Sequence, residues 1–199
     1  QPDYAEAYNN LGNVYKEMEE YNQAISVYEK AIELNPEYYE AYNNLGVVLG
    51  NNEQYKEAIK TYNKAISIKP DYAEAYYNMG VTLQDQGKLE EAIGSYKKAV
   101  SIKPDYDEAY FNIGVGLQDK GNLEESIQAY NSTIEINPNY ADAFYNKGNA
   151  LKQLGNLEEA IKAYNNALSI NPNNAEVYCN MGIVLNKQGK LEESIDAYN

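Results

Sequence analysis

The chain has 199 residues, of which 30 are acidic and 16 basic, and a net charge of −14 at pH 7 argues against nucleic acid and anionic membrane as partners. It contains no histidine and one cysteine, Cys179, which excludes histidine metal sites, histidine-dependent nucleophiles and an internal disulfide. No apolar run reaches the roughly 18–20 residues that cross a bilayer, and no secretion signal is recognisable, so we expect an intracellular, cytoplasmic protein.

The sequence repeats itself every 34 residues from end to end. Six prolines keep this step: Pro2, Pro36, Pro70, Pro104, Pro138 and Pro172. A glycine column beginning at Gly12 and a tyrosine column beginning at Tyr28 keep it as well. A period of this length is typical of solenoids, in which each unit packs only on its neighbours. We therefore expect one array over residues 1–199, with repeats 5–38, 39–72, 73–106, 107–140, 141–174 and a partial 175–199.

Each repeat predicts two helices, because apolar residues recur at helical steps in two segments. Glycine stands between the two segments at Gly87, Gly121, Gly155 and Gly189, where it suits a left-handed turn. The first two repeats have Glu19 and Glu53 at this position, so their turns should be closed differently or be slightly strained. Proline should end the second helix and suit the first turn of the next.

Small residues of the Gly12 and Ala24 columns indicate that the two helices of a repeat cross closely. Larger side chains, such as Leu11 and Tyr28, should fill the space on either side. Lys147 departs from this pattern, because it stands in a column otherwise made of leucine, methionine and isoleucine. We expect this lysine to extend its ammonium toward water or to loosen the packing of the fifth repeat.

The pattern Tyr8-x-x-Leu11-Gly12-x-x-Tyr15, followed by Ala24, Tyr28, Ala31 and Pro36, resembles the tetratricopeptide repeat. This resemblance covers essentially the whole chain. It implies an all-α fold, a right-handed superhelical solenoid of helix–turn–helix repeats. It also implies a concave inner face lined by positions 2, 5, 6, 9, 12 and 13 of each first helix.

Position 6 is asparagine in every repeat: Asn10, Asn44, Asn78, Asn112, Asn146 and Asn180. An amide carries both donors and an acceptor, so a row of them can pair with the backbone of an extended peptide. The alternative is that each amide bonds the neighbouring helix and fixes the stacking of repeats. The column is similar to that of the tetratricopeptide arm of O-linked N-acetylglucosamine transferases and Spindly-type proteins.

Position 5 carries three consecutive aromatic residues, Tyr77, Phe111 and Tyr145. In an open groove they would anchor a bound segment, since aromatic side chains supply much of the energy at interfaces. The alternative is that the rings pack against the adjacent repeat.

Position 2 is acidic in all six repeats, in part because carboxylates suit a helix N-terminus. Acids outnumber lysines across the six inner columns, so a carboxylate clamp of the kind that holds chaperone tails is absent. The expected partner is a neutral to basic protein or peptide segment. Cys179 stands on the same face, where its thiol could react or serve only as a small helical residue.

The leading interpretation is a protein–protein interaction scaffold that binds an extended peptide through its asparagines, with no enzyme activity, metal or cofactor. A second hypothesis is the substrate-recognition arm of a larger glycosyltransferase whose catalytic domain is not in this chain. A third is a self-stacking structural spacer, because Leu191, Ile195 and Tyr198 at one end and Tyr4, Tyr8 and Leu11 at the other should be exposed. We also expect the chain to be a fragment that stacks head to tail.

Overall fold

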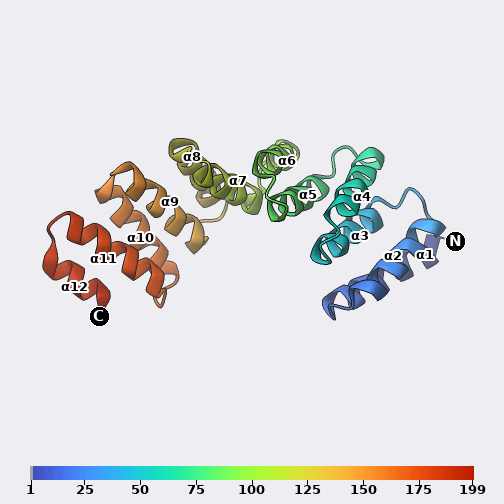
Figure 1. Ribbon diagram of the computed structural model, residues 1–199, viewed down its shortest axis with the longest axis horizontal. Helices are drawn as coiled ribbons and strands as arrows, with labels where there is room; N and C mark the ends of the chain where they lie inside the picture. The colour runs from blue at the N-terminus through green and yellow to red at the C-terminus, as the bar shows by residue number, and fades with distance from the viewer. Residues whose placement is uncertain (1) are drawn as a thin grey trace. The chain divides into compact units, whose positions relative to one another are not determined.

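The computed structural model describes residues 2–199, and in this part of the chain every regular element is an α-helix (Figure 1). The helices fall into two compact units, residues 1–104 and 105–199. The first unit contains α1 (Pro2–Glu17), α2 (Tyr21–Leu34), α3 (Tyr39–Asn51), α4 (Tyr55–Ile68), α5 (Ala73–Asp85) and α6 (Leu89–Ile102). The second contains α7 (Asp107–Asp119), α8 (Leu123–Ile136), α9 (Ala141–Leu154), α10 (Leu157–Ile170), α11 (Ala175–Lys187) and α12 (Leu191–Tyr198).

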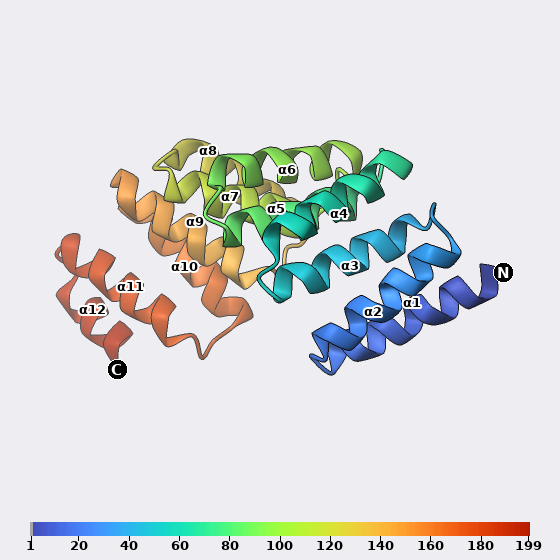
Figure 2. The same ribbon diagram turned by 45° about the vertical axis from the view of Figure 1, so that its right-hand side comes forward.

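Successive helices pair as hairpins, so each repeat contributes a first helix with an odd number and a second helix with an even number (Figure 2). Within each unit, a first helix also packs against the second helix of the preceding repeat. First helices of neighbouring repeats touch one another, α1 with α3 and α3 with α5 in the first unit. The predicted all-α architecture of repeated helical hairpins is confirmed.

The turn inside each hairpin is left-handed at one residue. Gly87, Gly121, Gly155 and Gly189 have φ between 76° and 82°. Glu19 and Glu53 adopt the same region, with φ of 59°, although their side chains make it costly. Of the two outcomes expected for these turns, strain is the one observed.

The prolines between repeats follow the end of a second helix, as expected, but they do not lie in the first turn of the next helix. Pro36 and Pro138, for example, lie in the turn that joins two repeats, three residues before the next helix begins, and not in its first turn. Asparagine precedes both, and its side-chain oxygen accepts a hydrogen bond from the N–H of Glu37 or Asn139. This side-chain turn, together with the fixed φ of proline, sets the direction of the chain between repeats.

The glycine and tyrosine columns form the contact inside each hairpin. Tyr62 of α4 is 1% exposed, and its ring lies so close to Gly46 of α3 that a Cβ there would stand 2.5 Å from the ring. The hydroxyls of the equivalent Tyr28, Tyr130 and Tyr164 donate to amide oxygens of their own first helices at 2.7–2.8 Å. The expected close crossing of the two helices is therefore present.

Lys147 is half-buried on α9 and lines a cavity of about 350 Å³ with Phe144, Leu151 and Ala163. Lys147 forms no ion pair with any residue that the structure describes. The fifth repeat thus lacks the apolar side chain that the other repeats carry in this column.

Candidate peptide-binding surfaces

The asparagine column runs along the first helices and links neighbouring repeats in the first unit. The amide nitrogen of Asn44 on α3 donates to the Oδ1 atom of Asn9 on α1 at 3.0 Å. Asn78 on α5 donates in the same way to Asn43 on α3, also at 3.0 Å. Asn9 and Asn43 are 6% and 5% exposed, so their carbonyl oxygens need these donors. Asn44 and Asn78 therefore link neighbouring repeats in the first unit, which is what the second interpretation of this column predicted.

Stacking leaves part of each amide unused. Asn44 and Asn78 are half-buried, and each has one bond through its nitrogen. Among the described residues, the Oδ1 atoms of both accept no hydrogen bond. One acceptor and one N–H per residue are thus available to a ligand. Asn10, on the first helix, is exposed and forms no hydrogen bond within the described range.

The column changes character in the second unit, because position 5 there is no longer an amide. Phe111 offers no acceptor, and the half-buried Asn146 that would pair with it forms no hydrogen bond to any described residue. Asn180 instead donates to the Tyr145 hydroxyl at 2.8 Å and accepts from Lys152 at 2.5 Å. Asn112 is half-buried, like Asn146 and Asn180. The whole amide of Asn146 is therefore available to a ligand.

The three aromatic residues of position 5 are half-buried and contact other rings. Tyr77 lies 5.7 Å from Tyr96 and Tyr145 lies 6.1 Å from Tyr164, measured between ring centroids. These are contacts with the second helix of the same repeat. Tyr77 and Tyr145 thus cover the buried tyrosines while leaving part of each ring exposed.

Phe111 makes two such contacts, with Tyr130 at 5.9 Å and with Tyr140, stacked at 5.0 Å. Stacked and tilted rings at these distances stabilise the fold beyond simple burial. Packing is thus observed for all three residues, and their role as peptide anchors stays a prediction.

A small polar network surrounds Tyr145. Its hydroxyl donates to Glu176 at 2.6 Å, and burial, followed by this carboxylate, raises the pKa of Tyr145. Burial and the nearby Lys187 together lower the pKa of Lys152. The carboxylates of position 2, Glu176 included, lie mostly at the surface. Two lysines therefore lie near one another on a face whose other charges are mainly acidic.

Cys179 is exposed on α11 and is a free thiol. It lines a cavity of about 410 Å³ with Tyr178 and the end of α12. Its reactivity stays a prediction.

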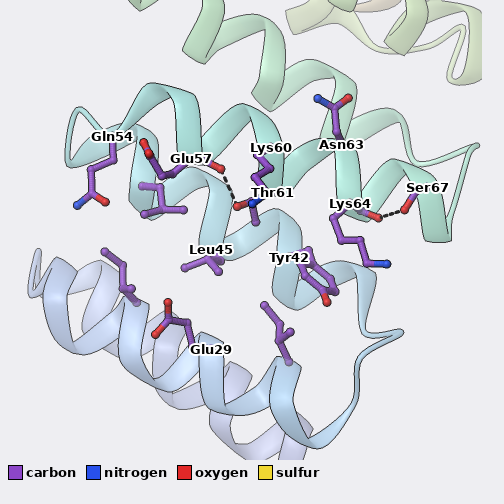
Figure 3. Close-up of a pocket in the computed structure, with 13 residues that line it drawn as sticks. Glu29, Tyr42, Leu45, Gln54, Glu57, Lys60, Thr61, Asn63, Lys64 and Ser67 are labelled. Carbon is purple, nitrogen blue, oxygen red and sulfur yellow. Dashed lines mark hydrogen bonds between the residues drawn. The ribbon is translucent and has the colours of Figure 1, made fainter.

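The sequence did not predict a cavity of about 700 Å³ that lies between α2, α3 and α4 (Figure 3). Tyr42, Leu45 and Leu49 of α3 line it at helical steps of three and four residues. Leu45 and Leu49 are 7% exposed each. The cavity depends on the spacing of α2 and α4, which no residue pattern in the sequence specifies.

The described residues contain no cluster of cysteine, aspartate and glutamate side chains suited to a metal ion. No helix among them combines the length and apolar character needed to cross a membrane.

The repeats of this chain match known family models. A model described as "TPR repeat" matches residues 51–87, 83–120, 117–155 and 148–189, and models described as "Tetratricopeptide repeat" match 5–38 and 27–60. A search of curated proteins by sequence found no match.

Solved structures of similar fold include MamA, with 26% identity and a TM-score of 0.75, over 83% of this chain and 96% of that one. YrrB, described as a TPR protein with an unusual peptide-binding site, has 29% identity and a TM-score of 0.70, over 85% and 88%. PilF of Pseudomonas aeruginosa has 21% identity and a TM-score of 0.85, over 98% and 89%, and is similar in fold.

Proposed function

Because the chain belongs to the tetratricopeptide repeat family, we propose that it is a protein-interaction scaffold that holds an extended peptide segment along its asparagines. The observation that carries this proposal is the unused hydrogen-bonding capacity of Asn44, Asn78 and Asn146. A half-buried amide without a partner is costly unless water or a ligand completes it. An extended peptide offers N–H and C=O groups that suit these amides, and YrrB is a relative in fold that is described as peptide-binding.

The aromatic residues beside the amides support the same proposal. Tyr77, Phe111 and Tyr145 are half-buried, so each leaves part of a ring for a bound side chain. The acidic side chains of position 2, such as Glu74 and Glu108, favour a neutral to basic segment. Lys152 and Lys187 would suit one acidic group of that segment near α11.

Two alanine variants separate peptide binding from stacking. Asn146→Ala removes an amide that bonds no described residue, so the free energy of unfolding should change little. Asn78→Ala strands the buried Oδ1 atom of Asn43, which should cost about 1–3 kcal/mol of stability. Both variants should weaken a peptide ligand about two- to tenfold, the equivalent of one neutral hydrogen bond.

The measurement begins with a displayed library of random peptides selected on the full chain. The strongest peptide is then synthesised and titrated against the parent protein and the two variants by calorimetry. Asn22→Ala, at an exposed asparagine of α2 outside the column, is the matched control and should leave the affinity unchanged. Thermal unfolding verifies that each variant folds. Unchanged affinity in both Asn78→Ala and Asn146→Ala would refute the proposal.

The asparagine column also motivates a second candidate, the recognition arm of a larger glycosyltransferase. In that case the chain supplies substrate binding and the reaction takes place in a separate domain. The natural gene product decides between the two: a catalytic domain beyond the array would support the arm, and a product made only of repeats would contradict it.

A third candidate, the self-stacking spacer, draws support from exposed apolar side chains. Val14 on α1 is 51% exposed, whereas its equivalent Val48 is fully buried by the preceding repeat. Leu191, Ile195 and Tyr198 on α12 are 52–60% exposed. If these faces pair between molecules, sedimentation should show concentration-dependent association that Val14→Glu and Ile195→Glu abolish. A monomer at all concentrations would exclude the spacer.

A further inference from the structure

The cavity between α2, α3 and α4 is separate from the asparagines and has a different chemical character. We propose that it is a second docking site, which takes a short amphipathic helix of a partner protein. Apolar side chains of two helices line it, Ile25 and Ile32 from α2 and Tyr42, Leu45 and Leu49 from α3. Together with residues of α4 they enclose about 700 Å³, within the size range of binding pockets. Figure 3 shows Leu45 and Tyr42 directed into this space from α3.

The lining favours a helix over an extended peptide. An extended peptide must pair its backbone N–H and C=O groups, and an apolar floor leaves them without partners at a cost of a few kcal/mol. A helix satisfies its own backbone and needs only an apolar stripe, which is the usual way a helix binds a groove. Tyr42, Leu45 and Leu49 lie at steps of three and four residues, so the floor itself is about two helical turns long.

Four charged side chains around the cavity have no charged partner in the described residues: Glu29 of α2 and Glu57, Lys60 and Lys64 of α4. They are exposed at the surface. In a chain with a net charge of −14, two cations beside two acids make this rim neutral, so it does not share the general preference for basic partners. A partner with charges of both signs would complete the rim.

The charges are also ordered along the cavity. Glu57 lies at the same end as Gln54, and Lys64 lies at the opposite end with Ser67 (Figure 3). A partner helix with acids in its first turn and lysines in its last turn agrees with its own dipole. Placed antiparallel to α4, such a helix brings its acids to Lys64 and its lysines to Glu57. This orientation satisfies both sets of charges.

The test uses two synthetic helical peptides of about 15 residues, each cross-linked between side chains to remain helical. Both have leucines at steps of three and four. One has glutamates in the first turn and lysines in the last, and the other has these charges exchanged. We expect fluorescence anisotropy to show that the full chain binds the first peptide about threefold or more tightly than the second.

The double variant Glu57→Lys/Lys64→Glu should reverse this preference, because it exchanges the charges at the two ends of the cavity. Both residues are exposed, so folding is preserved, and circular dichroism verifies this. The control is Glu37→Lys/Lys56→Glu, which changes the same kinds of charge in the same unit outside the cavity and should leave the preference unaltered.

Three results would overturn the proposal. The first is equal affinity of the parent protein for the two peptides, or no binding of either. The second is the same preference in the parent and the exchanged variant. The third is association of the chain with itself, removed by the exchanged variant in sedimentation, since the occupant would then be a second copy. The library-selected peptide is a separate readout, so loss of binding at the asparagines would not affect this outcome.

Discussion

Gly46 and Gly94 offer a matched pair, because the same change to alanine should have opposite effects within one unit. Both glycines lie inside helices, α3 and α6. Alanine is favoured over glycine in a helix interior by about 1 kcal/mol. Gly94 is exposed, and a Cβ there would meet nothing within 4 Å, so Gly94→Ala should gain this amount.

At Gly46 the same Cβ would stand 2.5 Å from Cε1 and 2.8 Å from Cδ1 of Tyr62. The Tyr62 ring is 1% exposed and has no room to withdraw. Overpacking of this kind costs about 1–3 kcal/mol, which offsets the gain in helix propensity and leaves Gly46→Ala up to about 2 kcal/mol less stable. The two variants should thus differ by about 1–3 kcal/mol.

Thermal unfolding followed by circular dichroism measures this difference, since 1 kcal/mol corresponds to about 2–4 °C for a chain of this size. Replacing the Tyr62 ring with a smaller side chain should remove the crowding. In a Tyr62→Leu background, Gly46→Ala should therefore stabilise the fold, which a double-mutant cycle would reveal. If Gly46→Ala raised the melting temperature as much as Gly94→Ala, the crowding argument would be refuted.

Three further predictions concern stability. Glu53→Gly should raise the free energy of unfolding in denaturant by about 0.5–1 kcal/mol, because relief of the left-handed backbone exceeds the added freedom of the unfolded chain. An unchanged or lower free energy of unfolding would show that Glu53 is unstrained. Burial raises the pKa of Tyr28, Tyr62, Tyr130 and Tyr164 above the unfolded value of about 10. The stability of the fold should therefore be constant below that pH and fall above it, because the unfolded chain releases protons that the folded chain retains. Melting temperatures that stay constant up to about pH 11.5 would contradict this prediction. Lys147→Met should stabilise the fifth repeat by about 1 kcal/mol in urea unfolding, since an apolar chain of similar length fills the same space; a loss of stability would show that the ammonium has a favourable partner.

The fold could be predicted because its information is local and repeated. The period of Pro36, Gly46 and Tyr62 sets the helical hairpins, and each column recurs often enough to distinguish it from chance. Proline ends the second helix as predicted, but the next helix begins three residues after Pro36 and not at it, because Asn35 forms a side-chain turn in between. The backbone of Glu53 follows the other hairpins in spite of its side chain, since packing on both sides determines the turn.

The candidate site was harder to predict, because its atoms come from different repeats. The sequence places Asn78 in the asparagine column but does not show that its nitrogen donates to Asn43, 35 residues earlier. Asn146 lacks the equivalent bond because Phe111, one repeat earlier, has no oxygen to accept it. The cavity at Leu45 depends on the separation of two second helices. Such distances arise from packing, and no single residue column encodes them.

The amide bonds of the first unit have a consequence for how such a chain changes its length. Each bond joins Asn44 to Asn9 or Asn78 to Asn43, and thus spans one repeat plus one residue. If residues 39–72 were excised, Asn78 would meet Asn9 in the same register, and no acceptor would be orphaned. Duplication of a repeat would likewise create its own new bond. Gain or loss of whole 34-residue modules is therefore neutral for this contact, whereas an insertion of one or two residues within a first helix would turn its asparagine away from its partner.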